Sequence, residues 1–434
     1  MVKFGNKVLK MVPIHIKTLI MNLVENTPIC YNKTKNIERT IYMPNFESLF
    51  REFENTNNLC KFYEDYNEND VSTRFLLIRS LDKPHLIDVI NLHIGETTER
   101  KPQILMKIVY ESDITIQQIL DYIETKRQDL ITTREAELQG LENVLTNIPV
   151  VNCGVRNDKV DDIVKAVVRN KTLKTIEKLE QEIDNAMLPR IRQYTLWSYY
   201  NQTANDIIEL FLLKHPLVIP TLRKIHDIDF FVKLENQIIP FDLKFTHISD
   251  SYFDLVSQGL TYHENASDDF SVVETGTSEI KSIKDFYKRF KRQYADEYEL
   301  PNLKGLEKND ILEILLSTEN EEAVTFVNQA KETHAAYVPA TSDQLRSLEW
   351  WNYKFQGERL FSNNNRLFVF LAYKNRFQDG RELKGKTAEI GEKINQLLTG
   401  LTDERIHTIS YHYDKQADLV GDYKAKVLST IYFE

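Results

Sequence analysis

Apolar and polar residues recur along the chain at spacings that predict both helices and strands. In residues 113–145, apolar residues return every three or four positions among many charges, which is typical of an amphipathic helix. A second such tract spans residues 159–188 and reaches Pro189, which we expect to stop or kink it. The short connection predicts an antiparallel helical hairpin over residues 113–188. Its apolar stripes either pack on the same domain or form the seam of a dimer.

Shorter apolar runs predict strands. Residues 73–80 (TRFLLIRS), 104–110 (ILMKIVY) and 366–373 (RLFVFLAY) are apolar and of strand length. Residues 387–398 instead have the spacing of an amphipathic helix, and the polar residues 265–279 predict a loop.

The character of the chain changes near residue 190. Before it, the pattern is mixed and largely helical, which predicts an N-terminal region over residues 1–190 for DNA recognition or dimerisation. After it, residues 191–434 alternate strands with helices and contain the residues that suggest chemistry.

The strongest chemical pattern lies in residues 223–246, RKIHDIDFFVKLENQIIPFDLKFT. Two apolar runs are separated by the polar residues 234–237, which predicts a hairpin that brings Asp229 near Asp242. Strand alternation places Asp242 and Lys244 on one face, with apolar residues on the opposite face.

An isolated acidic residue precedes this pattern. Residues 203–206 (TAND) resemble a capping box, which predicts that a helix begins there. Glu209 then lies in an otherwise apolar run, so it must pair, reach solvent or bind a cation, because burying a bare carboxylate is costly. Pro240 is unusual within the second apolar run, since proline is confined to the edges, bulges or starts of strands.

Two or three carboxylates with one lysine suit the hydrolysis of a phosphodiester. Carboxylate oxygens bind Mg²⁺, which keeps several waters and also binds phosphate. The ion lowers the pKa of a bound water, and a nearby lysine orients that water and offsets phosphate charge. A lone Asp-x-Lys triplet arises easily by chance and forms structural ion pairs, so the prediction depends on the ordered set of acids, turn and triplet.

That ordered set, Glu209, Asp229 and Asp242-Leu243-Lys244, resembles the signature of the PD-(D/E)XK nuclease superfamily, the restriction-endonuclease-like fold. The resemblance implies an α/β protein (α+β, mixed sheet) with an αβββαβ core, one or two Mg²⁺ ions and cleavage of DNA. It also implies that Asp229, Asp242 and Glu209 bind the metal together with the Leu243 carbonyl. Lys244 would then be the catalytic lysine.

The resemblance covers residues 207–246 and departs from the family pattern at one position. Ile228 stands where a proline usually precedes the first aspartate. Asp227 lies two residues before Asp229 and would share its strand face. The sequence therefore leaves open which of the two aspartates binds metal.

A basic stripe follows about forty residues later along a predicted helix, opposite an aromatic stripe. We interpret it either as a wall that contacts DNA phosphates or as an ordinary solvated face. The basic residues are Lys281, Lys284, Lys288, Lys291 and Arg292.

Composition narrows the class of protein. The net charge of −10, from 65 acidic and 55 basic residues, excludes a surface that coats nucleic acid everywhere but allows a local basic cleft. The 3 cysteines are far apart, so neither a zinc finger nor a disulfide framework is predicted. No apolar run approaches the roughly 18 residues of a membrane span, and the start lacks a signal peptide. We expect a cytoplasmic protein.

The sequence as a whole predicts a Mg²⁺-dependent endonuclease that acts on double-stranded DNA. We expect a type II restriction endonuclease without a nucleotide cofactor, because no Walker A motif is present. The alternatives are a non-specific anti-phage or repair nuclease, and a non-catalytic DNA-binding or scaffold protein. Since cutting two strands usually takes two sites, the resemblance implies a homodimer.

Overall fold

The structure is a computed structural model of the 434-residue chain. It describes residues 44–67, 70–148, 157–235, 237–259, 279–306, 308–357, 361–374 and 380–434. All of these belong to one compact unit, Met43–Glu434. The loop predicted for residues 265–279 lies outside the described residues, except that Glu279 begins a helix.

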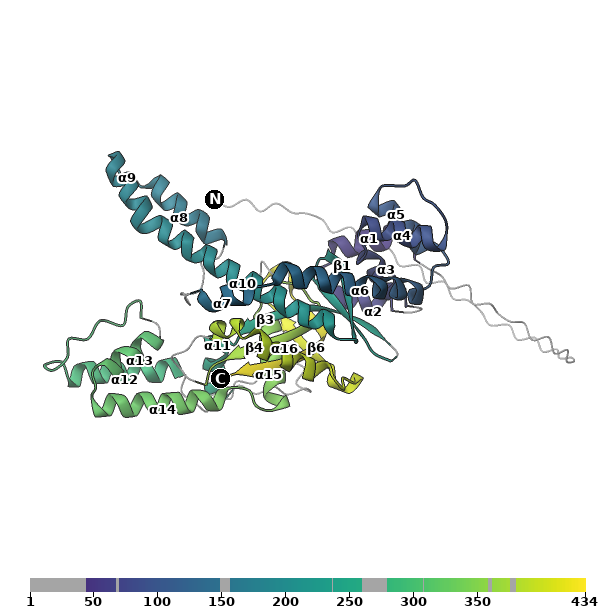
Figure 1. Ribbon diagram of the computed structural model, residues 1–434. Helices are drawn as coiled ribbons and strands as arrows, with labels where there is room; N and C mark the ends of the chain where they lie inside the picture. Colours follow the sequence, from purple (N-terminus) through teal and green to yellow (C-terminus); the bar gives the residue numbers. More distant parts are fainter. Residues whose placement is uncertain are drawn as a thin grey trace, which may run out of the picture. The chain divides into compact units, whose positions relative to one another are not determined.

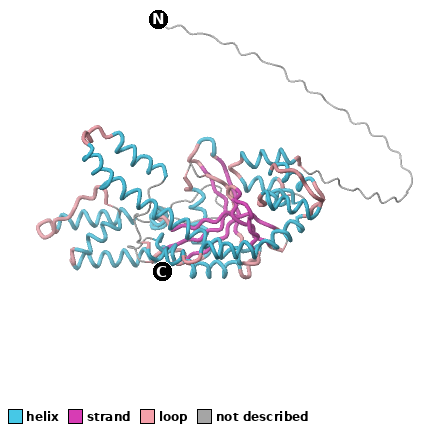
Figure 2. The backbone as a smooth tube through the Cα atoms, turned by 45° about the horizontal axis from the view of Figure 1, so that its top comes forward, coloured by secondary structure: helices cyan, strands magenta, loops and turns pink. Residues whose placement is uncertain are grey.

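A six-stranded mixed sheet forms the centre of this unit, in the order β1-β2-β3-β4-β6-β5. The first three strands are antiparallel, β4 is parallel to both β3 and β6, and β5 is antiparallel to β6. Figure 2 shows the strands together, with helices around them. The prediction of a mixed α/β protein is therefore confirmed. The strands are β1 (Val218–Ile225), β2 (Ile228–Lys233), β3 (Ile238–His247), β4 (Arg366–Ala372), β5 (His407–Tyr413) and β6 (Gly421–Phe433).

Helices precede the sheet, separate β3 from β4 and separate β4 from β5 (Figure 1). Those before the sheet are α1 (Phe46–Asn55), α2 (Leu59–Asp65), α3 (Val71–Arg79), α4 (Lys83–His93), α5 (Pro102–Glu111), α6 (Ile116–Leu138), α7 (Leu141–Asn147), α8 (Asn157–Arg169), α9 (Ile176–Glu182), the π-helical turn η2 (Ile183–Met187) and α10 (Leu188–Lys214). Those between β3 and β4 are α11 (Asp250–Ser257), α12 (Glu279–Gln293), α13 (Lys308–Ser317), α14 (Glu321–Tyr337) and α15 (Ser342–Lys354). Those after β4 are α16 (Thr387–Leu398) and the short 3₁₀ turns η4 (Gly380–Gly385), η5 (Asp403–Arg405) and η6 (Ala417–Leu419).

Two of the predicted strands are helices. Residues 73–80 lie mostly in α3, and residues 104–110 lie in α5. Nearly every residue of α3 is buried, so its sequence has no polar face that would show the helical period. The third predicted strand is confirmed as β4, in which every residue is buried, and the helix predicted for residues 387–398 is confirmed as α16.

The helical region also differs from its prediction. In the described part of residues 113–188, four α-helices, α6 to α9, and the turn η2 are found where two helices were expected. Pro189 does not stop the helix, because α10 continues directly from the π-helical turn η2. The residues expected to form a capping box, 203–206, therefore lie inside α10. The boundary predicted near residue 190 falls within a continuous helical run of α9, η2 and α10.

The two faces of the sheet are covered differently. One face packs against α10 and α16 in a single core that includes Phe230, Phe241 and Val369. The opposite face carries two separate cores. The first joins α1–α6 to β1 and β2, and the second joins α11 and α15 to β4, β5 and β6. Asp242 and Lys244 of β3 belong to neither core, so charged side chains can lie there without displacing apolar packing.

A further group of helices has its own core. α12, α13 and α14 pack on one another through residues such as Tyr287, Phe290 and Leu312. No residue of the sheet belongs to this core. These helices lie in the segment of chain that connects β3 to β4.

Candidate active site

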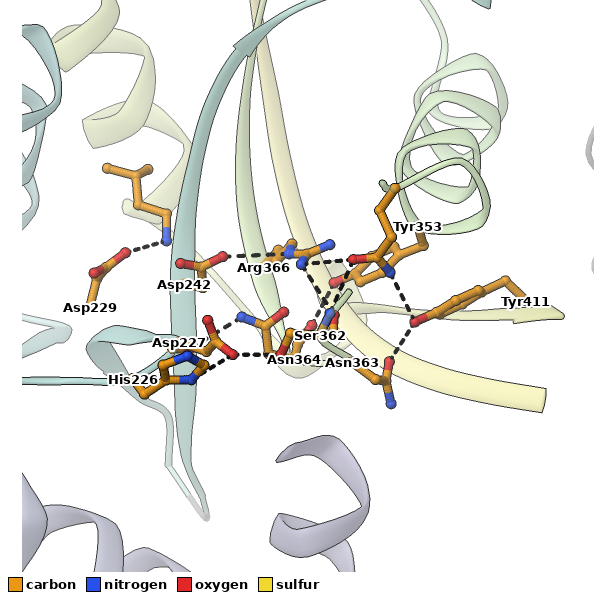
Figure 3. Close-up of polar contacts among 12 residues, drawn as sticks. His226, Asp227, Asp229, Asp242, Tyr353, Ser362, Asn363, Asn364, Arg366 and Tyr411 are labelled. Atoms are coloured by element: carbon orange, nitrogen blue, oxygen red, sulfur yellow. Dashed lines mark hydrogen bonds and ion pairs between the residues drawn. The ribbon is translucent and has the colours of Figure 1, made fainter. Parts of the chain in front are cut away.

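Asp229 and Asp242 lie side by side on neighbouring strands, as the sequence predicts. Phe230 of β2 pairs with Phe241 of β3 in antiparallel register, so the residues one step outward, Asp229 and Asp242, face each other. Opposed residues of an antiparallel pair point to the same face of the sheet. On the other side of β3, Asp242 pairs with Arg366 of β4. The three strands thus align Asp229, Asp242 and Arg366 in one row (Figure 3).

The Asp229 carboxylate is fixed by the backbone of the predicted triplet. Its Oδ2 accepts a hydrogen bond from the Leu243 N–H at 2.8 Å, and its backbone carbonyl accepts one from Thr221 Oγ1 at 2.9 Å. Burial raises the pKa of Asp229, and nearby Glu209 raises it further, while the Leu243 N–H lowers it. The Asp229 carboxylate therefore has a fixed orientation, and its negative charge is disfavoured by burial and by the nearby Glu209.

Asp242 lies between a carboxylate and a cation. Its Oδ2 is 3.4 Å from Arg366 Nε, and its side chain is 22% exposed. The pKa of Asp242 is raised to about 6, because burial and the charge of Asp229 raise it by more than Arg366 and Lys244 lower it.

Lys244 lies two residues further on the same face of β3 and is exposed to solvent. The protein atoms around it still remove part of its hydration, and this desolvation, with the charge of Arg366, lowers the pKa of Lys244. Asp242 opposes this shift. The ammonium can thus contact a ligand that approaches Asp229 and Asp242, hereafter the acid pair, from solvent.

Glu209 reaches Asp229 from α10. Both line a cavity of about 160 Å³, which is roomy enough for several water molecules. Burial raises the pKa of Glu209, and Lys224, which lines the same cavity, lowers it. Asp242 and Lys244 do not line this cavity, so the structure brings Glu209 to one member of the acid pair only.

Asp227 is placed differently from the expectation that it shares a strand face with Asp229. It lies in the turn between β1 and β2 with a positive φ of 59°. Its carboxylate accepts a hydrogen bond from Ser362 Oγ at 2.6 Å and pairs with His226 at 2.9 Å (Figure 3). Asp229, and not Asp227, therefore stands opposite Asp242.

The residues before β4 form a buried polar network, which the sequence pattern did not predict. Asn364 donates to the Asp227 carbonyl at 3.2 Å, and Asn365 donates to the Pro240 carbonyl at 3.2 Å. The Asp242 N–H in turn donates to the Asn365 carbonyl at 2.9 Å. Pairing of β3 with β4 begins at Asp242, so Pro240 is paired with β2 alone and lies in a part of β3 where a missing N–H is tolerated. Four consecutive polar residues, Ser362 to Asn365, directly before β4 were the signal that the sequence offered.

The acid pair fits the needs of Mg²⁺ better than those of an ion with many protein ligands. Among the described residues, no three Asp, Glu, His or Cys side chains form a group that could hold an ion. Mg²⁺ commonly uses only one or two carboxylates and keeps its remaining waters. Two desolvated carboxylates that face each other, Asp229 and Asp242, with the Leu243 carbonyl nearby on β3, supply such a small set of oxygen donors.

The predicted basic stripe lies on α12, and its aromatic face is buried in the core shared with α13 and α14. The side chains of Lys281, Lys288 and Arg292 are exposed and that of Lys284 is partly exposed. Lys291 donates to the Pro301 carbonyl at 3.1 Å and to Asn302 Oδ1 at 3.0 Å. The structure does not bring this stripe into the row of strand residues.

Comparison with known proteins adds no relative. No family model matches the chain, and no curated protein or solved structure is similar to it. Among the described helices, none is long and apolar enough to cross a membrane. What the protein does must therefore be argued from the chemistry of the row on β2, β3 and β4.

Proposed function

We propose that this chain is a metal-dependent nuclease that hydrolyses phosphodiester bonds of DNA. One observation carries the proposal: Asp229 and Asp242 face each other on paired strands, with Lys244 two residues further on the same face. The order of elements supports it, since α10 is followed by three antiparallel strands and later by β4, parallel to β3. That order is compatible with the αβββαβ core of the PD-(D/E)XK nucleases.

More particularly, we propose a type II restriction endonuclease that acts on double-stranded DNA as a homodimer. The elements outside the αβββ segment, α1–α9 and α11–α15, offer surface for contacts with a specific sequence. One such chain has one acid pair, so two copies would cut the two strands.

The residues of the proposed site have distinct tasks. Asp229 and Asp242 would hold Mg²⁺ together with the Leu243 carbonyl, and the Leu243 N–H keeps the Asp229 carboxylate in place. When bound there, the ion would supply an activated water and offset charge on the phosphate. Lys244, on the solvent side, donates to a phosphate oxygen and orients the attacking water. Glu209 binds water in the cavity beside Asp229.

The test is to incubate the protein with phage DNA and Mg²⁺. We expect discrete fragments. A smear would refute sequence-specific cleavage and indicate a non-specific nuclease. DNA that stays intact but is retarded in a gel would refute the proposed nuclease activity and indicate a DNA-binding protein.

Substitutions test the site itself. We expect Asp242→Ala and Lys244→Ala to abolish cutting while DNA binding largely survives. Glu392→Ala and Lys393→Ala are matched controls, because these exposed residues lie on α16, which covers the opposite face of the sheet. Full cleavage by either site variant would refute the assignment.

A further inference from the structure

Arg366 is a buried cation that faces the proposed metal ligand Asp242. Its side chain is 7% exposed, and its Nε lies 3.4 Å from Asp242 Oδ2. Nε makes no hydrogen bond, so the contact is an ion pair between charged groups. Figure 3 shows Arg366 on one side of Asp242 and Asp229 on the other.

The guanidinium is held in place by its own surroundings. One terminal nitrogen donates to Gln356 Oε1 and to the Ser362 carbonyl, each at 3.2 Å. The guanidinium carbon lies 4.9 Å from the centre of the Tyr353 ring, a favourable cation–π distance. Because arginine stays charged and this one is confined, its charge beside Asp242 is permanent.

A fixed cation on one side of a carboxylate limits how that carboxylate can bind a metal. Asp242 Oδ2 faces Arg366, which leaves the side of Asp242 toward Asp229 for an ion. Ca²⁺ takes six to eight oxygens and often binds both oxygens of a carboxylate. Mg²⁺ and Mn²⁺ accept six ligands in a compact octahedron, for which a single carboxylate oxygen suffices.

We propose that Arg366 is a positioning residue that presents Asp242 to the metal through one oxygen only, and so selects small octahedral ions over Ca²⁺. This inference rests on the proposed function, because it assumes that Asp242 binds a metal. Arg366 also repels a divalent cation, which weakens the binding of every such ion. The charge and position of Arg366 would then account both for the selectivity among divalent ions and for a modest affinity for each of them.

The experiment measures binding without DNA or catalysis. Mn²⁺ affinity is determined by electron paramagnetic resonance at pH 8, and Ca²⁺ affinity by competition with Mn²⁺, on the full chain. In Arg366→Met we expect Ca²⁺ affinity to rise by roughly tenfold or more and Mn²⁺ affinity to rise less. The preference for Mn²⁺ over Ca²⁺ therefore falls. An unchanged preference in the folded variant would overturn the proposal.

Two further variants keep the result interpretable. Tyr353→Phe is the matched control, since it removes a buried hydrogen bond to the Asn364 carbonyl but keeps the ring under Arg366, and it should leave the preference unchanged. Gln356→Glu is nearly isosteric and draws the guanidinium away from Asp242, so it should shift the preference as Arg366→Met does. If Arg366→Met does not fold, a wild-type preference in Gln356→Glu would refute the role of Arg366.

Asp242→Asn separates this inference from the proposed function. If Mn²⁺ binds this variant as it binds the wild type, or does not bind the wild type at all, the metal site itself is wrong. If Asp242→Asn loses Mn²⁺ while Arg366→Met keeps the wild-type preference, the metal site stands and only the role of Arg366 fails.

Discussion

At the scale of single residues, the site could be predicted where its parts are close in sequence. Asp229 and Asp242 are separated by one short turn, and strand alternation is enough to place them together. Arg366 reaches Asp242 through a parallel pairing of β3 and β4 that closes a long segment of chain. No local pattern marks such a pairing, so the counter-ion of Asp242 could not be read from the sequence.

The acid pair should cost the protein stability when no metal is present. The pKa of Asp229 is raised on folding, so its contribution to stability is full below the unfolded pKa and is lost as the pH rises through the folded value. We therefore expect Asp229→Asn, which can still accept the Leu243 N–H, to raise Tm by a few degrees at pH 8 in EDTA. Near pH 3 the gain should vanish.

Thermal unfolding followed by circular dichroism measures this effect. Asp418→Asn is a suitable control, because Asp418 is an exposed aspartate in the short turn η6. A Tm at pH 8 that is equal to or below the wild-type value would contradict the expectation.

At the scale of elements, prediction succeeded where apolar residues had a period and failed where they had none. α16 has one buried stripe, and its bounds follow from the sequence. α3 is buried almost all round, and short apolar runs of this kind do not distinguish a strand from a helix. The continuation of the helix past Pro189 was missed because a proline usually ends a helix, whereas here the π-helical turn η2 leads directly into α10.

If the basic stripe of α12 contacts DNA phosphates, removing one of its positive charges should change the salt dependence of DNA binding. We expect Lys284→Ala and Lys288→Ala each to weaken binding to all DNA sequences and to lower the log–log salt slope by about one. Fluorescence anisotropy at several salt concentrations measures both quantities. Lys331→Ala on neighbouring α14 serves as a control, and unchanged slopes in both α12 variants would identify the stripe as a solvated face.

At the scale of the whole molecule, the residues of α8, α9 and the first half of α10 contribute little to any core. Among the described side chains from 164 to 199, Val167 alone is buried. Val168 is 69% exposed and Ile176 is 58% exposed. The sequence left two interpretations of these helices, packing on their own domain or a dimer seam, and the sparse burial favours the seam.

A second copy of the chain would bury these apolar side chains in a symmetric contact. We expect Val168→Glu with Ile176→Glu to convert a dimer to a monomer in light scattering. The monomer should nick supercoiled plasmid but rarely linearise it. The exposed Leu92→Glu on α4 is the control, and a variant that stays dimeric would exclude these helices as the seam.

The polar segment before β4 also makes the surroundings of the proposed site depend on β6. Asn363 forms a bridge with Asn58 and donates to the Lys424 carbonyl at 3.0 Å, while the Lys426 N–H donates to Asn365. The support beneath Arg366 is thus complete only after β6 has left the ribosome. A nascent chain, or one released early, carries the aspartates without their surroundings. If the chain is the nuclease proposed above, we expect it to cut no DNA until β6 has been synthesised and has paired with β4.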